Sequence, residues 1–225
     1  MQTVCSSPAL DEEMEKEYIA PAEKPVYDFF KRIFDFVLAT LALIVLSPIF
    51  LGTYIAIKRE DGGQVIYKQT RLTKNGKPFT MYKFRSMVPN AEAMLESLMD
   101  RNEMTGPAFK IADDPRITKV GRVLRKTSID ELPQLLNIIK GDMSIIGPRP
   151  PLPREVEQYT PYQMHRLDVK TGLACYHECT GRSNANDFDE WVESDLRYIR
   201  ERSLLTDLKV IYWTARVVLT GRGAM

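Results

Sequence analysis

One long run of apolar residues dominates the hydrophobic pattern of the chain. Residues 33–57 (IFDFVLATLALIVLSPIFLGTYIAI) contain a single charged side chain, Asp35. As one straight helix the run would measure about 37 Å, at about 1.5 Å per residue, and a hydrocarbon core is about 30 Å thick. Helices of soluble proteins rarely stay apolar on every face over this length. The run therefore predicts a membrane-embedded segment rather than the buried helix of a soluble core.

Ser47 and Pro48 interrupt this segment near its middle. Proline removes the hydrogen bond to the carbonyl of Ile44 and its ring crowds that turn, so a helix should kink here. The serine hydroxyl can satisfy a freed carbonyl where water is absent. Both flanks of the segment are basic: Lys31, Arg32, Lys58 and Arg59. Because basic flanks are typical of the cytoplasmic side, we expect a re-entrant helix–break–helix over residues 28–59. A kinked spanning helix is the alternative.

The remaining pattern predicts a helix-rich α+β fold. Two short strands, over 64–72 and 78–87, are joined by a turn at 73–76 that contains Asn-Gly. Helical patterns follow over 89–101, 116–127, 132–141, 155–169 and 188–219, and the proline-rich stretch 147–153 predicts a rigid loop. Within the last pattern, residues 208–222 are apolar but carry Tyr212, Trp213 and Arg216. This mixture is typical of a helix at a membrane interface, and packing on the domain core is an equal alternative.

Composition and charge narrow the classes of function. The chain has 225 residues, with 31 basic and 30 acidic side chains, so its overall charge does not indicate a nucleic-acid partner. Residues 1–27 are acidic and have no apolar core, and we expect a flexible tail without a signal peptide there. Three cysteines without the spacing of a disulfide framework favour a reducing compartment.

The adjacent carboxylates Asp130 and Glu131 are the candidate reaction centre. Ser128 and Glu131 also fit a helix capping box, in which neither acid would do chemistry. With Ser128 as the N-cap, Pro133 would lie inside the helix, where its missing amide would remove a hydrogen bond. With Asp130 as the N-cap, Pro133 takes a position whose amide is unpaired in any case. We therefore expect Asp130 at the mouth of a helix, where amides and the helix dipole favour anions.

Basic residues gather on both sides of this pair. Nine Lys or Arg residues lie between 110 and 154, against five acids. Arginines together with a divalent cation could offset the charge of the two carboxylates and hold a diphosphate. From the residues alone, catalysis and an ordinary helix start remain open alternatives.

Several long motifs decide between these alternatives. "KFRSM" (83–87), "DDPRITKVGRVLRKTSIDELPQLLNIIKGDMSIIGPRP" (113–150), "TGL…GRSN" (171–184) and the closing "GRGAM" closely resemble the bacterial sugar transferase family, the monotopic phosphoglycosyl transferases. The resemblance covers residues 28–225. It implies an enzyme that transfers a sugar phosphate from a UDP-sugar to a polyprenol phosphate such as undecaprenyl phosphate and releases UMP. Such enzymes initiate exopolysaccharide, capsule or O-antigen-type glycans.

The resemblance also assigns roles to residues. It implies that Asp130 is a nucleophile that forms a covalent phosphosugar intermediate and contacts Mg²⁺, the expected cofactor, with Glu131 beside it. It places the family's re-entrant helix break at Ser47 and Pro48. The expected phosphate-binding and nucleotide-binding residues are Lys83, Arg85, Arg125, Arg149 and Arg182.

The expected organisation is thus an acidic tail (1–27), a re-entrant helix (28–59) and a membrane-associated catalytic domain (60–225). The implied location is the cytoplasmic face of the bacterial inner membrane, with membrane lipids as further partners and a homodimer left open. A non-enzymatic, membrane-anchored module that binds anionic lipid or a protein is the rival interpretation. His177-Glu178 departs from a common Trp-Gln pair of relatives, and the sugar is not predicted.

Overall fold

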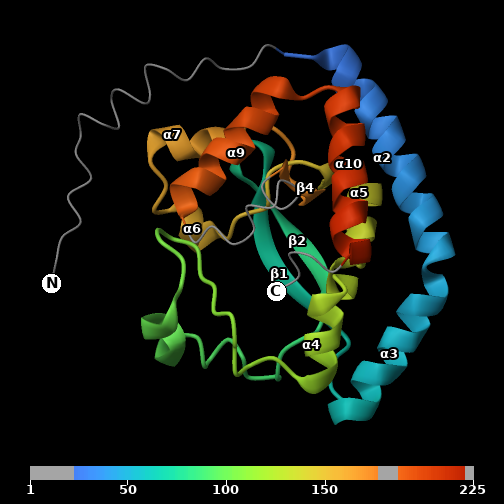
Figure 1. Cartoon of the computed structure of the whole chain (residues 1–225), viewed down its shortest axis with the longest axis vertical. Helices are drawn as coiled ribbons and strands as arrows, with labels where there is room; N and C mark the ends of the chain where they lie inside the picture. Colours follow the sequence, from blue (N-terminus) through green and yellow to red (C-terminus); the bar gives the residue numbers. More distant parts are fainter. Residues whose placement is uncertain (1–22, 177–186, 221–225) are drawn as a thin grey trace, which may run out of the picture.

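The computed structural model describes residues 23–176 and 187–220. Two consecutive helices, α2 (Pro25–Val45) and α3 (Ser47–Asp61), form a long arm along one side of the molecule (Figure 1). The last helix, α10 (Leu204–Thr220), lies beside α2. Asp207 joins them, because its carboxylate accepts hydrogen bonds from Tyr27 and Lys31, each at 2.8 Å. The start of α10 is therefore packed against the start of α2.

The predicted break in the apolar segment is confirmed. α2 and α3 meet at an angle of 59°, and the Ser47 hydroxyl donates to the carbonyl of Ile44 at 2.8 Å. Among the described residues, no single helix has the length and hydropathy to cross a membrane, whereas the bent pair meets both criteria together. α2 begins at Pro25, before the expected start.

The arm packs one side on the domain, through polar and apolar residues, and exposes an apolar side. Asp35 is only 4% exposed and accepts a hydrogen bond from the amide of Ile145 at 3.1 Å. Arg32 donates to the carbonyls of Ile138 and Ile139 at the end of helix α5 (Gln134–Lys140), where a cation is favoured by the helix dipole. The apolar side chains that remain exposed in the arm include Val26, Phe29, Phe30, Phe36, Val37, Leu41, Ile44, Val45 and Leu51.

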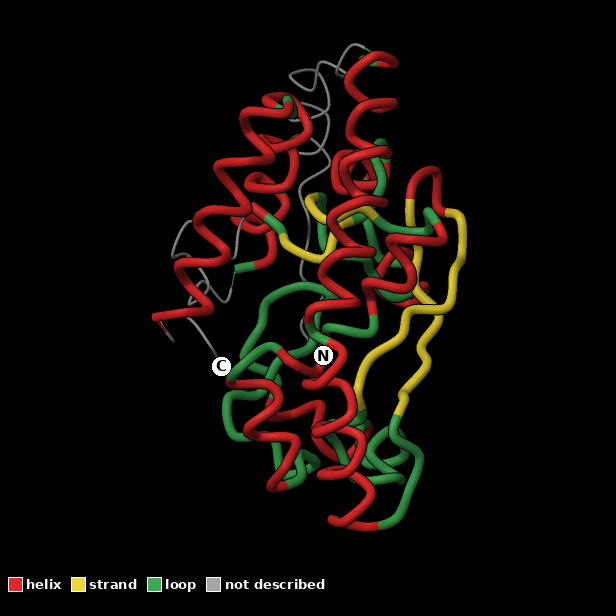
Figure 2. Tube along the Cα trace, turned by 90° about the vertical axis from the view of Figure 1, so that its right-hand side faces the viewer, coloured by secondary structure: helices red, strands yellow, loops and turns green. Residues whose placement is uncertain are grey.

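The predicted hairpin is also confirmed. β1 (Ile66–Thr73) pairs antiparallel with β2 (Lys77–Phe84), with Tyr67 opposite Lys83. The connection is a short 3₁₀ turn, η1 (Lys74–Gly76), in which Asn75 and Gly76 have positive φ angles of 59° and 70°, a conformation that Asn and Gly tolerate best. Figure 2 shows the two long strands along one side of the molecule, with helices packed on the other.

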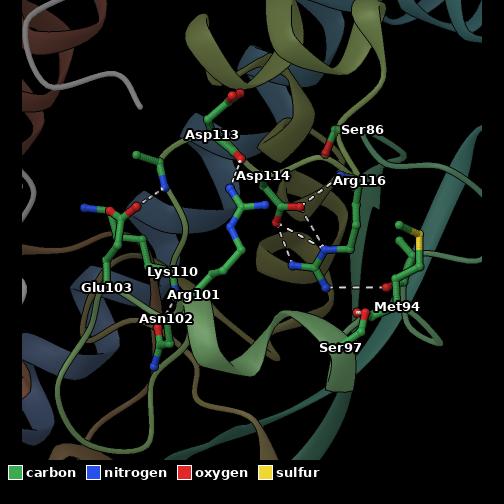
Figure 3. Close-up of polar contacts among 12 residues, drawn as sticks. Ser86, Met94, Ser97, Arg101, Asn102, Glu103, Lys110, Asp113, Asp114 and Arg116 are labelled. Atoms are coloured by element: carbon green, nitrogen blue, oxygen red, sulfur yellow. Dashed lines mark hydrogen bonds and ion pairs between the residues drawn. The ribbon is translucent and has the colours of Figure 1, made fainter.

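The helix expected over 89–101 is wrong. The connection from β2 to the next helix contains turns and one 3₁₀ helix, η2 (Glu96–Arg101). A buried ion pair fixes this irregular course: Asp114 accepts two hydrogen bonds from Arg116 Nε, at 2.9 and 3.2 Å, and one from Nη2 at 2.6 Å (Figure 3). Arg116 also donates to the carbonyl of Ala91 at 3.4 Å. Tertiary contacts here outweigh the local helical pattern.

Short elements complete the domain. They are α4 (Lys119–Lys126), η3 (Ile129–Glu131), α5 (Gln134–Lys140), β3 (Ser144–Ile146), α6 (Pro153–Val156), α7 (Pro161–Met164), η4 (His165–Leu167), β4 (Gly172–Ala174) and α9 (Phe188–Glu201). The helix expected over 155–169 is divided, because Thr160 caps a new helix at Pro161. β3 and β4 form a parallel pair that the sequence pattern did not predict.

The domain core lies between the hairpin, α5, α9 and α10. α10 contributes Val210, which is fully buried with Leu196 and Ile199 of α9. Its other side leaves Leu205 and Tyr212 each 64% exposed. Packing of this helix on the domain core is confirmed for one side, and its location at a membrane interface stays a prediction.

Candidate active site

The acid pair lies in a tight turn rather than at a helix mouth. Ser128 has a positive φ of 55°, the 3₁₀ helix η3 follows, and α5 begins only at Gln134. The expected N-cap role of Asp130 is wrong, and no side-chain cap is made by Ser128 either. Ile129 and Leu132 pack on the apolar cluster around Phe84, so apolar anchors on each side of the acids set this turn.

The two carboxylates have different surroundings. Asp130 is 7% exposed, and burial raises the pKa of its carboxyl, although the charges of Lys83 and Arg125 act in the opposite direction. Glu131 binds Lys83, with 2.8 Å between Oε1 and Nζ. Loss of water raises the pKa of Glu131, but Lys83 and the nearby Arg149 outweigh this effect and the net pKa is lowered. The site thus holds Glu131 as an anion next to a poorly solvated Asp130.

Three of the expected cationic residues surround this pair. Lys83 comes from β2 and contacts Glu131 directly. Arg125 comes from α4 and donates to the hydroxyl of Ser86 at 3.0 Å. Arg149 lies in the loop between β3 and α6, where its guanidinium stacks 5.3 Å from the ring centre of Trp191. Lys83 and Arg125 each lower the pKa of Asp130, and Lys83 and Arg149 lower that of Glu131, so all three cations favour the charged forms of the pair.

Close backbone packing positions α4. A Cβ atom on Gly121 would lie 2.0 Å from the carbonyl oxygen of Ser86, so only glycine permits this approach. The amide of Thr118 donates to the same carbonyl at 3.1 Å. Arg125 is therefore held at a fixed distance from β2 and from the acid pair that follows it.

One predicted site residue does not join this group, and another lies outside the described residues. Arg85 forms an ion pair with Asp61 at the end of α3, so its guanidinium is directed at the arm. Arg182 lies outside the described residues, as does the His177-Glu178 pair. Phosphate binding by either arginine stays a prediction.

A further arginine was missed by the sequence interpretation. Arg71 of β1 is 6% exposed, donates to the carbonyl of Pro150 at 2.9 Å, and contributes to the lowered pKa of Glu131. Burial and the nearby Arg149 lower the pKa of Arg71 to about 10. Its place at an inward position of an alternating strand was the only sequence signal available.

The carboxylates could serve a magnesium ion. Among the described residues, no group of three or more His, Cys, Asp or Glu side chains converges. Mg²⁺ is commonly bound by one or two carboxylates together with substrate phosphates and water. The Asp130 and Glu131 pair therefore fits an ion that arrives with a phosphorylated substrate, but not a site made of protein ligands alone.

Comparison with known proteins identifies the family. The family model described as bacterial sugar transferase matches residues 26–221. The chain belongs to the bacterial sugar transferase family. The resemblance inferred from the motifs is thus confirmed, and the three cations and both acids of the site lie within the matched region.

Several curated members of this family are similar to the chain. "Galactosyl transferase CpsE" of Streptococcus agalactiae is 47% identical over 196 residues, 86% of this chain and 43% of that protein. "Undecaprenyl-phosphate galactose phosphotransferase" of Salmonella typhimurium is 41% identical over 200 residues, 87% of this chain and 42% of that protein. "Exopolysaccharide production protein ExoY" of Sinorhizobium fredii is 41% identical over 207 residues, 90% of this chain and 91% of that protein. The chain thus spans less than half the length of the first two relatives and most of the third.

Proposed function

We propose that this bacterial sugar transferase moves a sugar phosphate from a UDP-sugar to a polyprenol phosphate, such as undecaprenyl phosphate, and releases UMP. The product would be the first lipid-linked intermediate of an exopolysaccharide, capsule or O-antigen-type glycan. The observation that carries the proposal is a buried Asp130 carboxylate next to an ion-paired Glu131, with Arg125 and Arg149 close by. Family relatives named as undecaprenyl-phosphate sugar phosphotransferases support the same reaction class.

The proposed mechanism has two displacements at one carboxylate. A carboxylate oxygen of Asp130 attacks the phosphorus that bears the sugar, an oxygen–phosphorus bond forms, and the bond to UMP breaks. An oxygen of the lipid phosphate then attacks the same phosphorus and releases the Asp130 carboxylate. Splitting the transfer lets a soluble donor and a membrane lipid meet the enzyme in turn.

The side chains around Asp130 serve charge and orientation. Lys83 holds Glu131 at 2.8 Å and keeps it anionic, while Arg125 and Arg149 offset the charge of the phosphoryl group in transfer. Glu131 and Lys83 together restrict how the turn can move. Mg²⁺, held at Asp130 with the substrate phosphates, would supply further positive charge to the diphosphate.

We further propose that α2 and α3 enter the bilayer from the cytoplasmic face of the inner membrane and return to it. The 59° bend, the exposed apolar side of the arm and the inward-facing Asp35 support a re-entrant segment. The exposed side of α10, with Leu205, Leu208 and Tyr212, would lie at the same interface. Labelling of Asp28→Cys and Arg59→Cys with an impermeant maleimide tests this, since a re-entrant arm exposes both positions on one side. Labelling from opposite sides would require a spanning helix.

The reaction is tested by UMP release from purified protein in nanodiscs. A panel of UDP-sugars with Mg²⁺ and undecaprenyl phosphate would identify the donor. Asp130→Asn should abolish release and the mass increase of the Asp130 peptide expected from the intermediate. Asp100→Asn is the matched control, because Asp100 is exposed and remote from the pair in the chain.

Each outcome separates the enzyme from its rival. Release that persists in Asp130→Asn would place the nucleophile elsewhere. A non-enzymatic module that binds anionic lipid would need the cations of the site but not Asp130. Lipid binding by a protein that shows no UMP release under any condition would therefore favour the non-enzymatic module.

A further inference from the structure

A cavity lies along β1, the strand that pairs with the Lys83-bearing strand β2. Its volume is about 340 Å³, and it opens at the outer edge of β1. The side chains that matter to its chemistry are Tyr67, Gln69, Thr70, Glu92, Leu152 and Arg154. Ligand sites in proteins range from about 300 to 1,000 Å³, so the volume of the cavity lies at the lower end of that range.

The edge of β1 supplies unpaired backbone groups to this cavity. The amide of Leu72 donates outward to the carbonyl of Pro151 at 3.0 Å. In an antiparallel pair every second residue directs both backbone groups the same way, so Thr70 and Lys68 also face outward. No described residue hydrogen bonds to these outward groups. A row of free donors and acceptors on a strand edge can pair with the polar edge of a base.

Tyr67 connects the cavity to the acid pair. It lies opposite Lys83 in the hairpin, and side chains in such positions share one face of the sheet. Lys83 in turn contacts Glu131 at 2.8 Å. The Tyr67 side chain is partly exposed, at 37% for the whole residue, so its ring offers a stacking surface one side chain away from the dyad.

Three charged residues line the same space: Lys68, Glu92 and Arg154. The side chains of Glu92 and Arg154 both line the cavity, and neither forms a hydrogen bond or ion pair with a described residue. The turn that carries Glu92 is held in place by Arg116, which donates to the carbonyl of the preceding residue (Figure 3). A carboxylate suits ribose hydroxyls, and a guanidinium suits a phosphate.

Arg71 links the far side of the cavity to Arg149. Its Nε and Nη2 donate to Gln69 Oε1 at 3.0 and 2.7 Å, and its Nη1 donates to the Pro150 carbonyl. Pro150 follows Arg149 directly in the chain. Arg71 thus contacts both Gln69, which lines the cavity, and the loop that carries Arg149.

We propose that this cavity binds the nucleoside half of the donor, with the base against Tyr67 and the strand edge, and the diphosphate directed to Arg149 and Asp130. This inference rests on the proposed function, whose UDP-sugar donor makes uridine the expected nucleoside.

The test measures UMP binding by calorimetry on the full chain in nanodiscs, independently of turnover. Tyr67→Leu should weaken UMP binding about tenfold, because stacking on an aromatic ring is lost, and should raise the KM for the UDP-sugar but not for the polyprenol phosphate. Tyr67→Phe keeps the ring and should bind UMP like the wild type. Tyr82→Leu is the matched control, since Tyr82 lies on the same hairpin and contacts Lys140 instead.

The outcomes distinguish the two proposals. Unchanged UMP affinity in Tyr67→Leu, in an enzyme that turns over, would overturn the cavity assignment and leave the proposed function standing. Equal losses in Tyr67→Leu and Tyr82→Leu would attribute the effect to the hairpin and also overturn it. UMP binding that depends on Tyr67 in a wild type without turnover would support the nucleoside site and contradict the reaction. A wild type that neither binds UMP nor releases it would contradict both.

Discussion

The buried pair of Asp114 and Arg116 should be a main determinant of stability in the connection between β2 and α4. The side chains of Asp114 and Arg116 are 4% and 7% exposed, and Arg116 also stacks on Phe109 at 5.2 Å. Asp114→Asn leaves the guanidinium buried without its anion. Removing one partner of a buried ion pair costs about 3–5 kcal/mol.

This loss is large enough to measure as a shift in thermal unfolding. For a domain of this size about 1 kcal/mol corresponds to about 2–4 °C, so Asp114→Asn should lower Tm by about 6–20 °C. Circular dichroism of the nanodisc-bound protein would follow the transition. Asp113→Asn is the control, because the neighbouring Asp113 is exposed and should change Tm little.

A double variant tests the electrostatic cause. Asp114→Asn combined with Arg116→Met removes both charges, and should be less destabilised than Asp114→Asn alone because no unpaired charge remains. A Tm for Asp114→Asn within about 2 °C of the wild type, a change of about 1 kcal/mol or less, would refute the reasoning. Such a result would mean that water reaches the guanidinium when its partner is removed.

The pH dependence of this pair has a definite sign. Burial raises the pKa of Asp114, but hydrogen bonds from Arg116 outweigh it and the net pKa is lowered. A carboxylate with a lowered pKa stabilises the fold fully above its unfolded pKa, about 3.9, and loses that contribution as pH falls through the folded value. The difference in stability between wild type and Asp114→Asn should therefore stay constant from about pH 7 to about pH 4.5 and shrink only below that. A gap that closes near pH 6 would contradict this assignment.

Three further perturbations test other parts of the site and fold. Lys83→Met removes a positive charge that lowers the pKa of Asp130, whose pKa is already raised by burial. The acidic limb of the pH profile of kcat/KM for UMP release should therefore move to higher pH. A move to lower pH would contradict the assignment. Asn137→Leu removes two side-chain hydrogen bonds to the outer edge of β2, of 3.1 and 2.7 Å. Urea unfolding should show that the free energy of unfolding falls by about 2–5 kcal/mol. A fall of less than about 1 kcal/mol would mean that water replaces the amide. Trp191→Leu removes the ring beneath Arg149 and should raise the donor KM severalfold, with Trp191→Phe between it and the wild type; equal KM values in all three would show that the ring does not position the guanidinium.

The elements that could be predicted from the sequence have local causes. The break at Ser47 and Pro48 follows from a missing amide and a nearby hydroxyl, and the hairpin turn follows from Asn75 and Gly76, which accept positive φ angles. The irregular course of residues 85–118 could not be predicted in this way. It depends on Asp114 meeting Arg116 in a buried position, which no periodicity reveals.

In the candidate active site too, residues with local signals could be predicted and residues with distant partners could not. The acid pair and its neighbouring cations were found because they occur in continuous motifs. Arg71 was missed because its partner, the Pro150 carbonyl, lies 79 residues away. The N-cap assigned to Asp130 failed because Ser128 adopts a left-handed conformation and inserts a 3₁₀ turn before α5.

The polar contacts of α2 have a consequence for how the chain is made. The hydrogen-bond partner of Asp35, the amide of Ile145, is synthesised 110 residues later, and the partner of Lys31, Asp207, is synthesised 176 residues later. A ribosome adds about 5–20 residues per second, so the first helix spends many seconds without the groups that neutralise its charges. During that interval the polar side chains of α2 lack the partners that they have in the folded chain. Shortening the chain before α10 would therefore leave the start of α2, not only the C-terminal end, without its partners.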